Sequence, residues 1–341
     1  MNYWEARASV REIGRRLRRR PFVWLLMLAL LLGAGGCSKR SAEPLHLGLT
    51  MWAGTIPFYA AAERRFYDPV KVEFVPSESN ADTCQAVSEG RLELAAMSLF
   101  EALELLDKGA DFRIIMATSY SNGADGLVAQ RSIATLKDLR GQRIAVGIGA
   151  FSHLILRRVL ERAGVPEAEV TLVNLSTKQG AEALEQGKVD AAMLWEPYLS
   201  HARTEQTHTL FTTAEIPAEL PDVLLARSDV IAQRHDDLLS VLRAWDRTVR
   251  IWNSHPDEIE GVMARSASTS LDELRTGKSG IVVLDLAHSL AFFDPAQKEA
   301  SLWKAYERTA NFMASHNLLT RAPRPSQEIL DARLVTEATA K

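Results

Sequence analysis

Short apolar segments with a two-residue period alternate along the chain with segments whose apolar positions fit a helix. Residues 45–49 and 70–74 show the two-residue period of strands, and residues 57–66 between them fit a helix. The further strand candidates are 92–97, 113–118, 126–129, 143–146, 170–173 and 191–194. The further helix candidates among them are 82–89, 152–163, 181–186 and 196–203. This alternation predicts two-residue-period strands connected by helices throughout the first two thirds of the chain.

Glycines mark the ends of three of these helices, at Gly90, Gly164 and Gly187. Beyond residue 229 the pattern becomes mainly helical, with a helix expected at 237–252 and another at 297–313. The first of these carries a helical stripe formed by Leu238, Leu239, Val241, Leu242, Trp245, Val249 and Trp252.

Strands that alternate with helices predict an α/β fold with mostly parallel sheets and helices on both faces. In such folds ligands bind near the carboxyl ends of the strands. About 305 residues follow the N-terminal segment, which is more than one hydrophobic core usually serves. We therefore expect two lobes.

The N-terminal segment has the order of a secretory signal. Residues 11–20 contain six arginines and one acid, and residues 22–36 are an uncharged, mostly apolar run that ends in small residues before Cys37. The run is short for a membrane span, which needs about 20 apolar residues. An uncleaved anchor helix is the alternative.

The end of this segment, Ala34-Gly35-Gly36-Cys37, resembles the lipobox of bacterial lipoproteins, although Ala34 stands where leucine is usual. The resemblance implies a signal peptide over 1–36, lipid on Cys37 and a tether over 37–44. It places the protein on the periplasmic side of a bacterial membrane, held there by lipid.

Charge and cysteine usage narrow the function. Without residues 1–36 the chain keeps 33 basic and 41 acidic side chains, so a basic nucleic-acid footprint is absent. Cys37 and Cys84 are the only cysteines, which excludes a disulfide framework. No CxxC or HExxH pattern occurs and the histidines are scattered, so we expect neither a metal site nor a cofactor.

A glycine turn, Gly147-Ile148-Gly149, leads from a strand into a helix that opens near Ser152 and His153. Such a turn aims backbone N–H groups and the positive end of the helix dipole at a bound group, and a small anion fits there. The dinucleotide fingerprint is incomplete, because Ser152 stands where the third glycine belongs. A plain capping role for Ser152 stays open.

Other polar and aromatic residues follow predicted strands. Ser98 ends one strand and can cap the next helix, and residues 118–125 (TSYSNGAD) are rich in donors. Trp52 and Trp195 come directly after strands, where an indole can wall a pocket. Ordinary packing is the alternative for both tryptophans.

Several segments, in order, resemble the solute-binding proteins of ABC importers for nitrate, taurine, alkanesulfonates and thiamine-pyrimidine precursors. The matching segments are LGLTMWAGTIPFYAAAERRF, AVSEGRLELAAMSLFEAL, SNGADGLVA, ATLKDLRGQRIAVGIGAFSHLILRRVLERAG and VDAAMLWEPYLSHA. The resemblance implies a two-lobed periplasmic-binding-protein clamp of type II, with lobe 1 over 45–128 plus 223–341 and lobe 2 over 129–222. Ligand would bias the clamp toward its closed form.

The resemblance also implies a function and a site. The protein would capture a small organic anion or zwitterion, similar to a sulfonate, taurine or nitrate, and deliver it as a monomer to a permease and its ATPase. Two alternatives are an enzyme on the same scaffold, similar to a pyrimidine synthase, and a ligand-sensing lipoprotein. The implied ligand-binding residues are Trp52, Thr55, Ser98, Ser121, Asp125, Ser152, His153, Trp195 and Glu196. Ser98 and Ser152 would hold the polar head, and Asp125 or Glu196 would accept from an amine.

Overall fold

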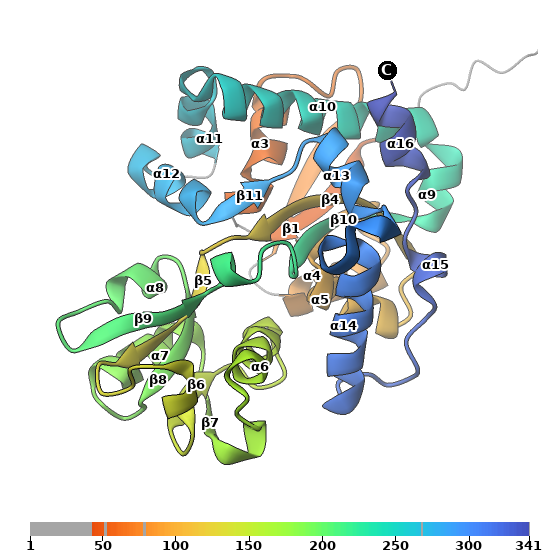
Figure 1. The fold of residues 1–341 in the computed structure, drawn as a ribbon. Helices are drawn as coiled ribbons and strands as arrows, with labels where there is room; N and C mark the ends of the chain where they lie inside the picture. The colour runs from red at the N-terminus through yellow and green to blue at the C-terminus, as the bar shows by residue number, and fades with distance from the viewer. Residues whose placement is uncertain (1–42, 51–52, 78–79, 267–268, 341) are drawn as a thin grey trace, which may run out of the picture. The chain divides into compact units, whose positions relative to one another are not determined.

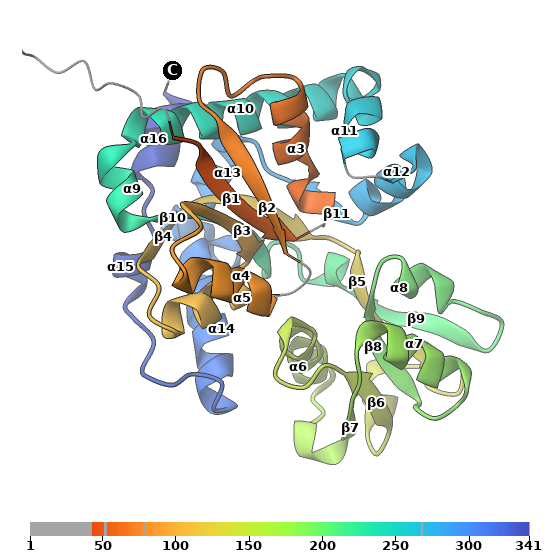
Figure 2. The same ribbon diagram turned by 180° about the vertical axis from the view of Figure 1, so that it is seen from behind.

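The structure is a computed structural model that describes residues 43–50, 53–77, 80–266 and 269–340. Trp52, Cys37 and the expected signal segment 1–36 lie outside the described residues, as does most of the expected tether. The described chain contains two β-sheets, each covered by helices (Figures 1 and 2). Within this part of the chain, no helix has both the length and the apolar character needed to cross a membrane.

The first sheet has six strands. They are β1 (Leu45–Thr50), β2 (Val72–Ser77), β3 (Leu94–Ser98), β4 (Phe112–Ser121), β10 (Pro221–Arg227) and β11 (Ile281–Val283). Their order across the sheet is β11-β4-β10-β3-β1-β2. Only β1, β2 and β3 pair in parallel, and the other pairs are antiparallel.

The second sheet has five strands. They are β5 (Asp125–Gln130), β6 (Arg143–Val146), β7 (Thr171–Asn174), β8 (Ala191–Trp195) and β9 (Thr207–Thr212). Their order is β7-β6-β8-β5-β9, with β6 parallel to β7 and β8, and β5 antiparallel to β8 and β9. The expected mostly parallel pairing is therefore wrong for both sheets. Every antiparallel pair involves β5 or β10, the first strands after the two crossovers, or the short edge strand β11.

Helices cover both faces of each sheet. The longer helices over the first sheet are α3 (Ile56–Glu63), α4 (Asn80–Ser88), α5 (Leu99–Asp107), α10 (His235–Ser254), α12 (Leu271–Ser279) and α14 (Leu302–Ser315). Shorter ones are α9 (Ser228–Gln233), α11 (Glu260–Ser266), α13 (Leu286–Phe292), α15 (Ser326–Ile329) and α16 (Arg333–Thr339). The second sheet carries α6 (Phe151–Ala163), α7 (Thr177–Glu185) and α8 (Tyr198–His201).

Sequence pattern explains the best-defined elements. All seven apolar positions of the predicted stripe on α10 are buried, and Trp245 donates its indole N–H to the carbonyl of Leu284. Gly164 ends α6 in the left-handed region at φ 66, as predicted. The helix expected at 297–313 is split, because a 3-10 turn over Pro295–Ala300 precedes α14 and Ser301 caps the latter.

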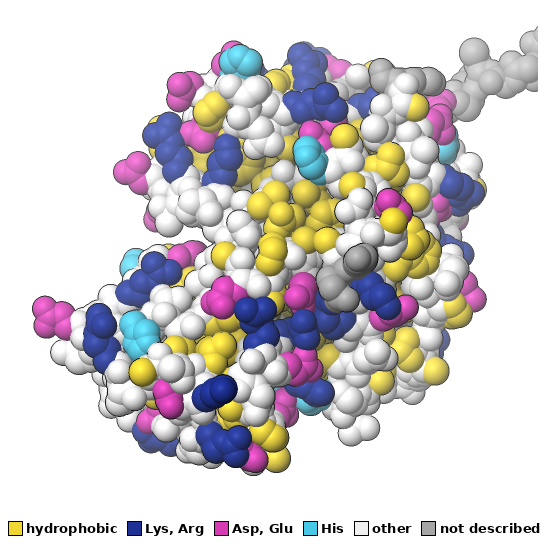
Figure 3. Space-filling view, viewed as in Figure 1, with side chains coloured by type: hydrophobic (Ala, Val, Ile, Leu, Met, Phe, Trp, Pro, Cys, Tyr) yellow, Lys and Arg dark blue, Asp and Glu magenta, His cyan; other side chains and the backbone are white. Residues whose placement is uncertain are grey.

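The chain passes between the sheets earlier than expected. Asp125 already pairs with Trp195 in the second sheet, so residues 125–128 belong to that sheet rather than to lobe 1. On the return, Pro221 and Asp222 already pair with β4 of the first sheet. The predicted crossovers at 128–129 and 223–225 thus lie inside strands. Figure 3 shows the surface hollowed between the part that carries α11 and α12 and the part that carries α8 and β9.

Candidate functional site

A cavity of about 420 Å³ lies where ends of strands from both sheets meet. Its walls come from the turn between β3 and α5 on the first sheet, and from the turn between β6 and α6 on the second. The residues that line it are Thr55, Ala96, Met97, Ser98, Glu101, Ser121, Asp125, Gly147, Ala150, Phe151, Ser152, Leu175, Ser176, Thr177, Trp195, Leu220 and Asp222. This size suits a small organic molecule.

The start of α5 is closed on itself by a capping box. Ser98 accepts the backbone N–H of Glu101 at 3.2 Å, and the Glu101 carboxylate accepts both the N–H and the hydroxyl of Ser98 at 3.0 Å. Burial raises the pKa of Glu101, and the bonds from Ser98 oppose that rise. The predicted capping role of Ser98 is confirmed.

The start of α6 has no such cap. Its N-cap is Ala150, whose side chain can accept nothing, and Ser152 is the second helical residue rather than the cap. Among the described residues, no acceptor is found for the backbone N–H groups of Phe151 and Ser152. Because the first N–H groups of a helix carry its positive dipole end, this turn presents donors to the cavity.

A buried carboxylate, Asp125, lies beside the crossover. It is 6% exposed, and burial raises its pKa from 3.8 to about 6, helped by the charge of Glu196 and opposed by a hydrogen bond from Ser121. The buried hydroxyl of Thr213, on the return crossover, lies 2.7 Å from that of Ser121 and donates to the carbonyl of Asp125. The two crossovers therefore hold Asp125 together.

The remaining wall residues add one aromatic face and one further acid. Trp195, the Cα partner of Asp125 across the β5–β8 pair, is 41% exposed, so its ring is available to a bound molecule. Asp222 accepts the Ser119 hydroxyl at 2.6 Å. Ser176 opens α7 with a capping box to Gln179. None of the described lining residues is a lysine or an arginine.

The structure brings most of the predicted site residues together. Those that line the cavity are Thr55, Ser98, Ser121, Asp125, Ser152 and Trp195. His153 does not line it, because its ring turns under α6, accepts the N–H of Gly149 and contacts Glu167. Glu196 does not line it either, because its carboxylate accepts the N–H and hydroxyl of Ser200 at the start of α8.

Sequence reasoning missed four polar lining residues, which are Glu101, Ser176, Thr177 and Asp222. The Ser-x-x-Glu spacing of a capping box signals Glu101, and Ser-x-x-Gln signals Ser176. Asp222 gives no local signal, since only the antiparallel pairing of β10 with β3 and β4 brings it to this edge.

Comparison with known proteins identifies relatives over most of this chain. A family described as NMT1/THI5 like matches residues 52–259. A Bacillus subtilis (strain 168) protein named for aliphatic sulfonate binding is 23% identical over 69% of this chain and 75% of its own. The taurine-binding periplasmic protein of Escherichia coli (strain K12) is 21% identical over 77% of this chain and 83% of its own.

Solved structures share the fold. The periplasmic aliphatic sulphonate binding protein SsuA from Escherichia coli superposes with a TM-score of 0.71 at 19% identity, over 85% of this chain and 98% of its own. The desulfurization enzyme DSZB superposes with a TM-score of 0.61 at 16% identity, over 87% of this chain and 99% of its own. The predicted α/β two-lobed fold class is thereby confirmed.

Proposed function

The chain belongs to the NMT1/THI5-like family, and from this premise we propose that it is an extracytoplasmic solute-binding protein that holds a small zwitterion in the cavity. The observation that carries the proposal is that two unlike groups line one cavity. The uncapped start of α6 offers donors, and the buried carboxylate of Asp125 offers an acceptor.

The start of α6 is suited to the anionic head of the solute. A sulfonate or carboxylate oxygen can accept from the N–H groups of Phe151 and Ser152 and from the Ser152 hydroxyl. Ser98 contributes less, because its hydroxyl already serves Glu101. The head therefore binds mainly from the second sheet.

The acidic walls are suited to an amine. Glu101, Asp125 and Asp222 all line the cavity, and no lining residue within the described chain carries a positive side chain. A purely anionic solute would enter against these carboxylates, whereas an ammonium group would be attracted to them. An amino sulfonate such as taurine satisfies both ends, and the face of Trp195 covers the short chain between them.

The residues that line the cavity support solute binding for transport rather than catalysis. The described lining residues include no cysteine, histidine or lysine, and the contact between Ser98 and Glu101 belongs to a capping box that holds the start of α5. We further propose that lipid on Cys37 holds the protein at the membrane surface, and that closure around the solute forms the surface recognised by a permease and its ATPase. A relative named as an ABC transporter periplasmic binding protein, 21% identical over 93% of this chain, supports this role.

A matched pair of solutes tests the proposal. The purified protein is stripped of bound solute by unfolding and refolding, and its thermal stability is measured with taurine, ethanesulfonate, nitrate and a pyrimidine. We expect a saturable rise with taurine, about 2.7 kcal/mol at a hundred times its Kd, and a much smaller rise with ethanesulfonate, which lacks the amine.

A matched pair of variants locates the binding. Trp195→Ala is expected to lose most of the taurine response, whereas Leu271→Ala, which truncates a residue of similar exposure on α12, is expected to keep it. Equal responses to taurine and ethanesulfonate would contradict the zwitterion. Turnover of a bound compound by the protein alone would contradict carriage.

A further inference from the structure

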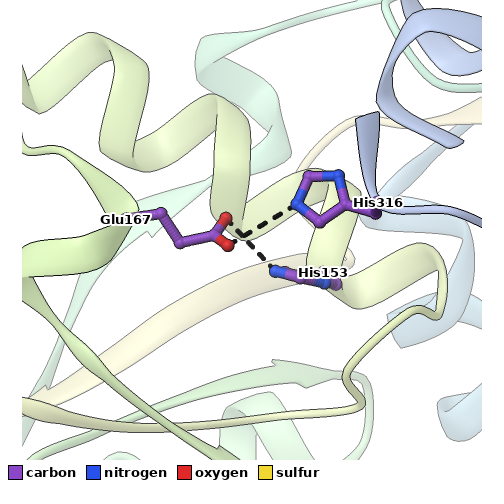
Figure 4. A group of neighbouring side chains, drawn as sticks. All are labelled: His153, Glu167 and His316. Carbon is purple, nitrogen blue, oxygen red and sulfur yellow. Dashed lines mark hydrogen bonds and ion pairs between the residues drawn. The ribbon is translucent and has the colours of Figure 1, made fainter. Parts of the chain in front are cut away.

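Away from the cavity, three side chains converge where α6 approaches the end of α14. His153 lies on α6, Glu167 lies in the 3-10 turn Glu167–Glu169 beyond it, and His316 follows α14, which packs on α5 of the first sheet. Figure 4 shows both imidazole rings turned toward the one carboxylate. The side chains are 2%, 30% and 18% exposed, respectively.

The spacing of these groups suits a metal ion. Nε2 of His153 lies 3.3 Å from one carboxylate oxygen of Glu167, and Nε2 of His316 lies 3.5 Å from the other. All three ligand atoms lie within 4.8 Å of one another. With bonds of about 2.0–2.2 Å, two ligands of a tetrahedral zinc ion lie about 3.4 Å apart.

The ring of His316 is already oriented for such a role. Its Nδ1 lies 2.9 Å from the carbonyl oxygen of Phe312, which can only accept, so Nδ1 carries a proton and Nε2 is the nitrogen that faces Glu167. A backbone carbonyl behind a histidine is the usual support of a metal ligand. The ring of Phe312 also contacts both imidazoles, with centroids 5.4 and 4.3 Å away.

The ring of His153 links the cluster to the cavity. Its Nδ1 accepts the N–H of Gly149, so in the metal-free protein the proton sits on Nε2 and faces Glu167. A metal ion bound to Nε2 displaces the proton from that nitrogen. The neutral ring then carries its proton on Nδ1, which can no longer accept from Gly149, so the N–H of Gly149 must turn away. Gly149 has φ 77 and belongs to the turn whose Gly147 lines the cavity.

We propose that His153, Glu167 and His316 bind one divalent transition-metal ion, of the Zn²⁺ type, that ties α6 to the end of α14. Two imidazoles and one carboxylate favour Zn²⁺, Ni²⁺ or Cu²⁺ over Ca²⁺ and Mg²⁺, which prefer oxygen ligands. The fourth position is left to water. Because the ligands come from segments over different sheets, the ion links those two segments. Its binding also affects the ligand cavity, because Gly149 belongs to the same turn as the lining residue Gly147.

Zinc itself is the probe. The protein, purified without a histidine tag and treated with a chelator, is titrated with Zn²⁺ by calorimetry and thermal unfolding, with Ca²⁺ in parallel. We expect one zinc ion per chain, a rise in Tm that a chelator reverses, and no response to Ca²⁺. Absence of zinc binding by the parent protein would overturn the proposal.

Variants assign the ligands. His316→Ala and Glu167→Gln are expected to lower zinc affinity by about tenfold or more, since even outer-shell partners of a metal contribute about 10–100-fold. His255→Ala changes an exposed histidine that directly follows α10. This variant is expected to bind zinc as the parent does. Unchanged affinity in both ligand variants, or an equal loss in His255→Ala, would place the zinc elsewhere.

Discussion

The two sides of the cavity treat their polar groups differently. On the first-sheet side, Ser98 and Glu101 satisfy one another at the start of α5. On the second-sheet side, the start of α6 has no side-chain cap, and the carboxylate of Asp125 is buried against the charge of Glu196. The polar groups at the start of α5 have hydrogen-bond partners without a solute, whereas those on the second-sheet side gain hydrogen-bond partners when a solute binds.

This difference separates polar groups that stabilise the fold from polar groups that are placed to bind the solute. A capping box stabilises its helix whether or not a ligand is present, so losing it lowers the free energy of unfolding. An uncapped helix start is unfavourable in the empty protein, and so is the buried carboxylate of Asp125, whose burial, unlike that of Glu101, is not offset by a capping box. Their presence at one edge is the reason to place the charged ends of the solute there.

The largest effect is expected from Asp125→Asn. The loss of a charge-assisted hydrogen bond, about 1.5–3 kcal/mol, should weaken taurine binding by roughly 10–100-fold and leave the weak binding of ethanesulfonate unchanged. Calorimetric titration of both solutes measures this. Asp257→Asn, which changes an exposed acid outside the cavity, serves as the control. Equal losses for the two solutes would show that Asp125 shapes the cavity rather than recognising an amine.

The pH dependence of Asp125 comes next. Its pKa is about 6 in the folded protein and lower when unfolded, so its contribution to stability is fully present below about pH 4 and is lost as the pH rises through 6. Asp125→Asn should therefore be more stable than the parent at pH 7, by at most on the order of 3 kcal/mol, with little difference at pH 4. Thermal unfolding of the solute-free proteins across this range measures the difference.

Taurine binding should follow the opposite course. The amine needs the ionised carboxylate, so affinity should fall by up to about tenfold per pH unit below 6. Glu101 and Asp222 also line the cavity, so the pH dependence has to be assigned with a variant. A parent and an Asp125→Asn variant with the same pH profile would show that Asp125 is not the group responsible.

The local sequence predicted where helices begin better than it predicted which distant residues come into contact. Ser98, Ser152 and Trp195 follow strands, and the ends of strands meet at one edge, so their place at the cavity could be predicted. The crossovers could not be located to the residue, because residues 125–128 have the same apolar pattern whichever sheet they join. His153 and His316 are 163 positions apart, and only the packing of α6 against α14 makes them neighbours.

The smallest effects come from two serine variants that separate the two sides most directly. Ser98→Ala removes the cap of α5 and should lower the free energy of unfolding by about 1 kcal/mol, with little effect on taurine affinity. Ser152→Ala removes a hydroxyl outside the helix cap, so stability should stay within about 0.5 kcal/mol while affinity falls roughly 2–10-fold. Ser254→Ala, on an exposed part of α10, controls for both. If Ser98→Ala weakened taurine binding as much as Ser152→Ala and left stability unchanged, the head of the solute would lie between the two helix starts, and the capping box would open when it binds.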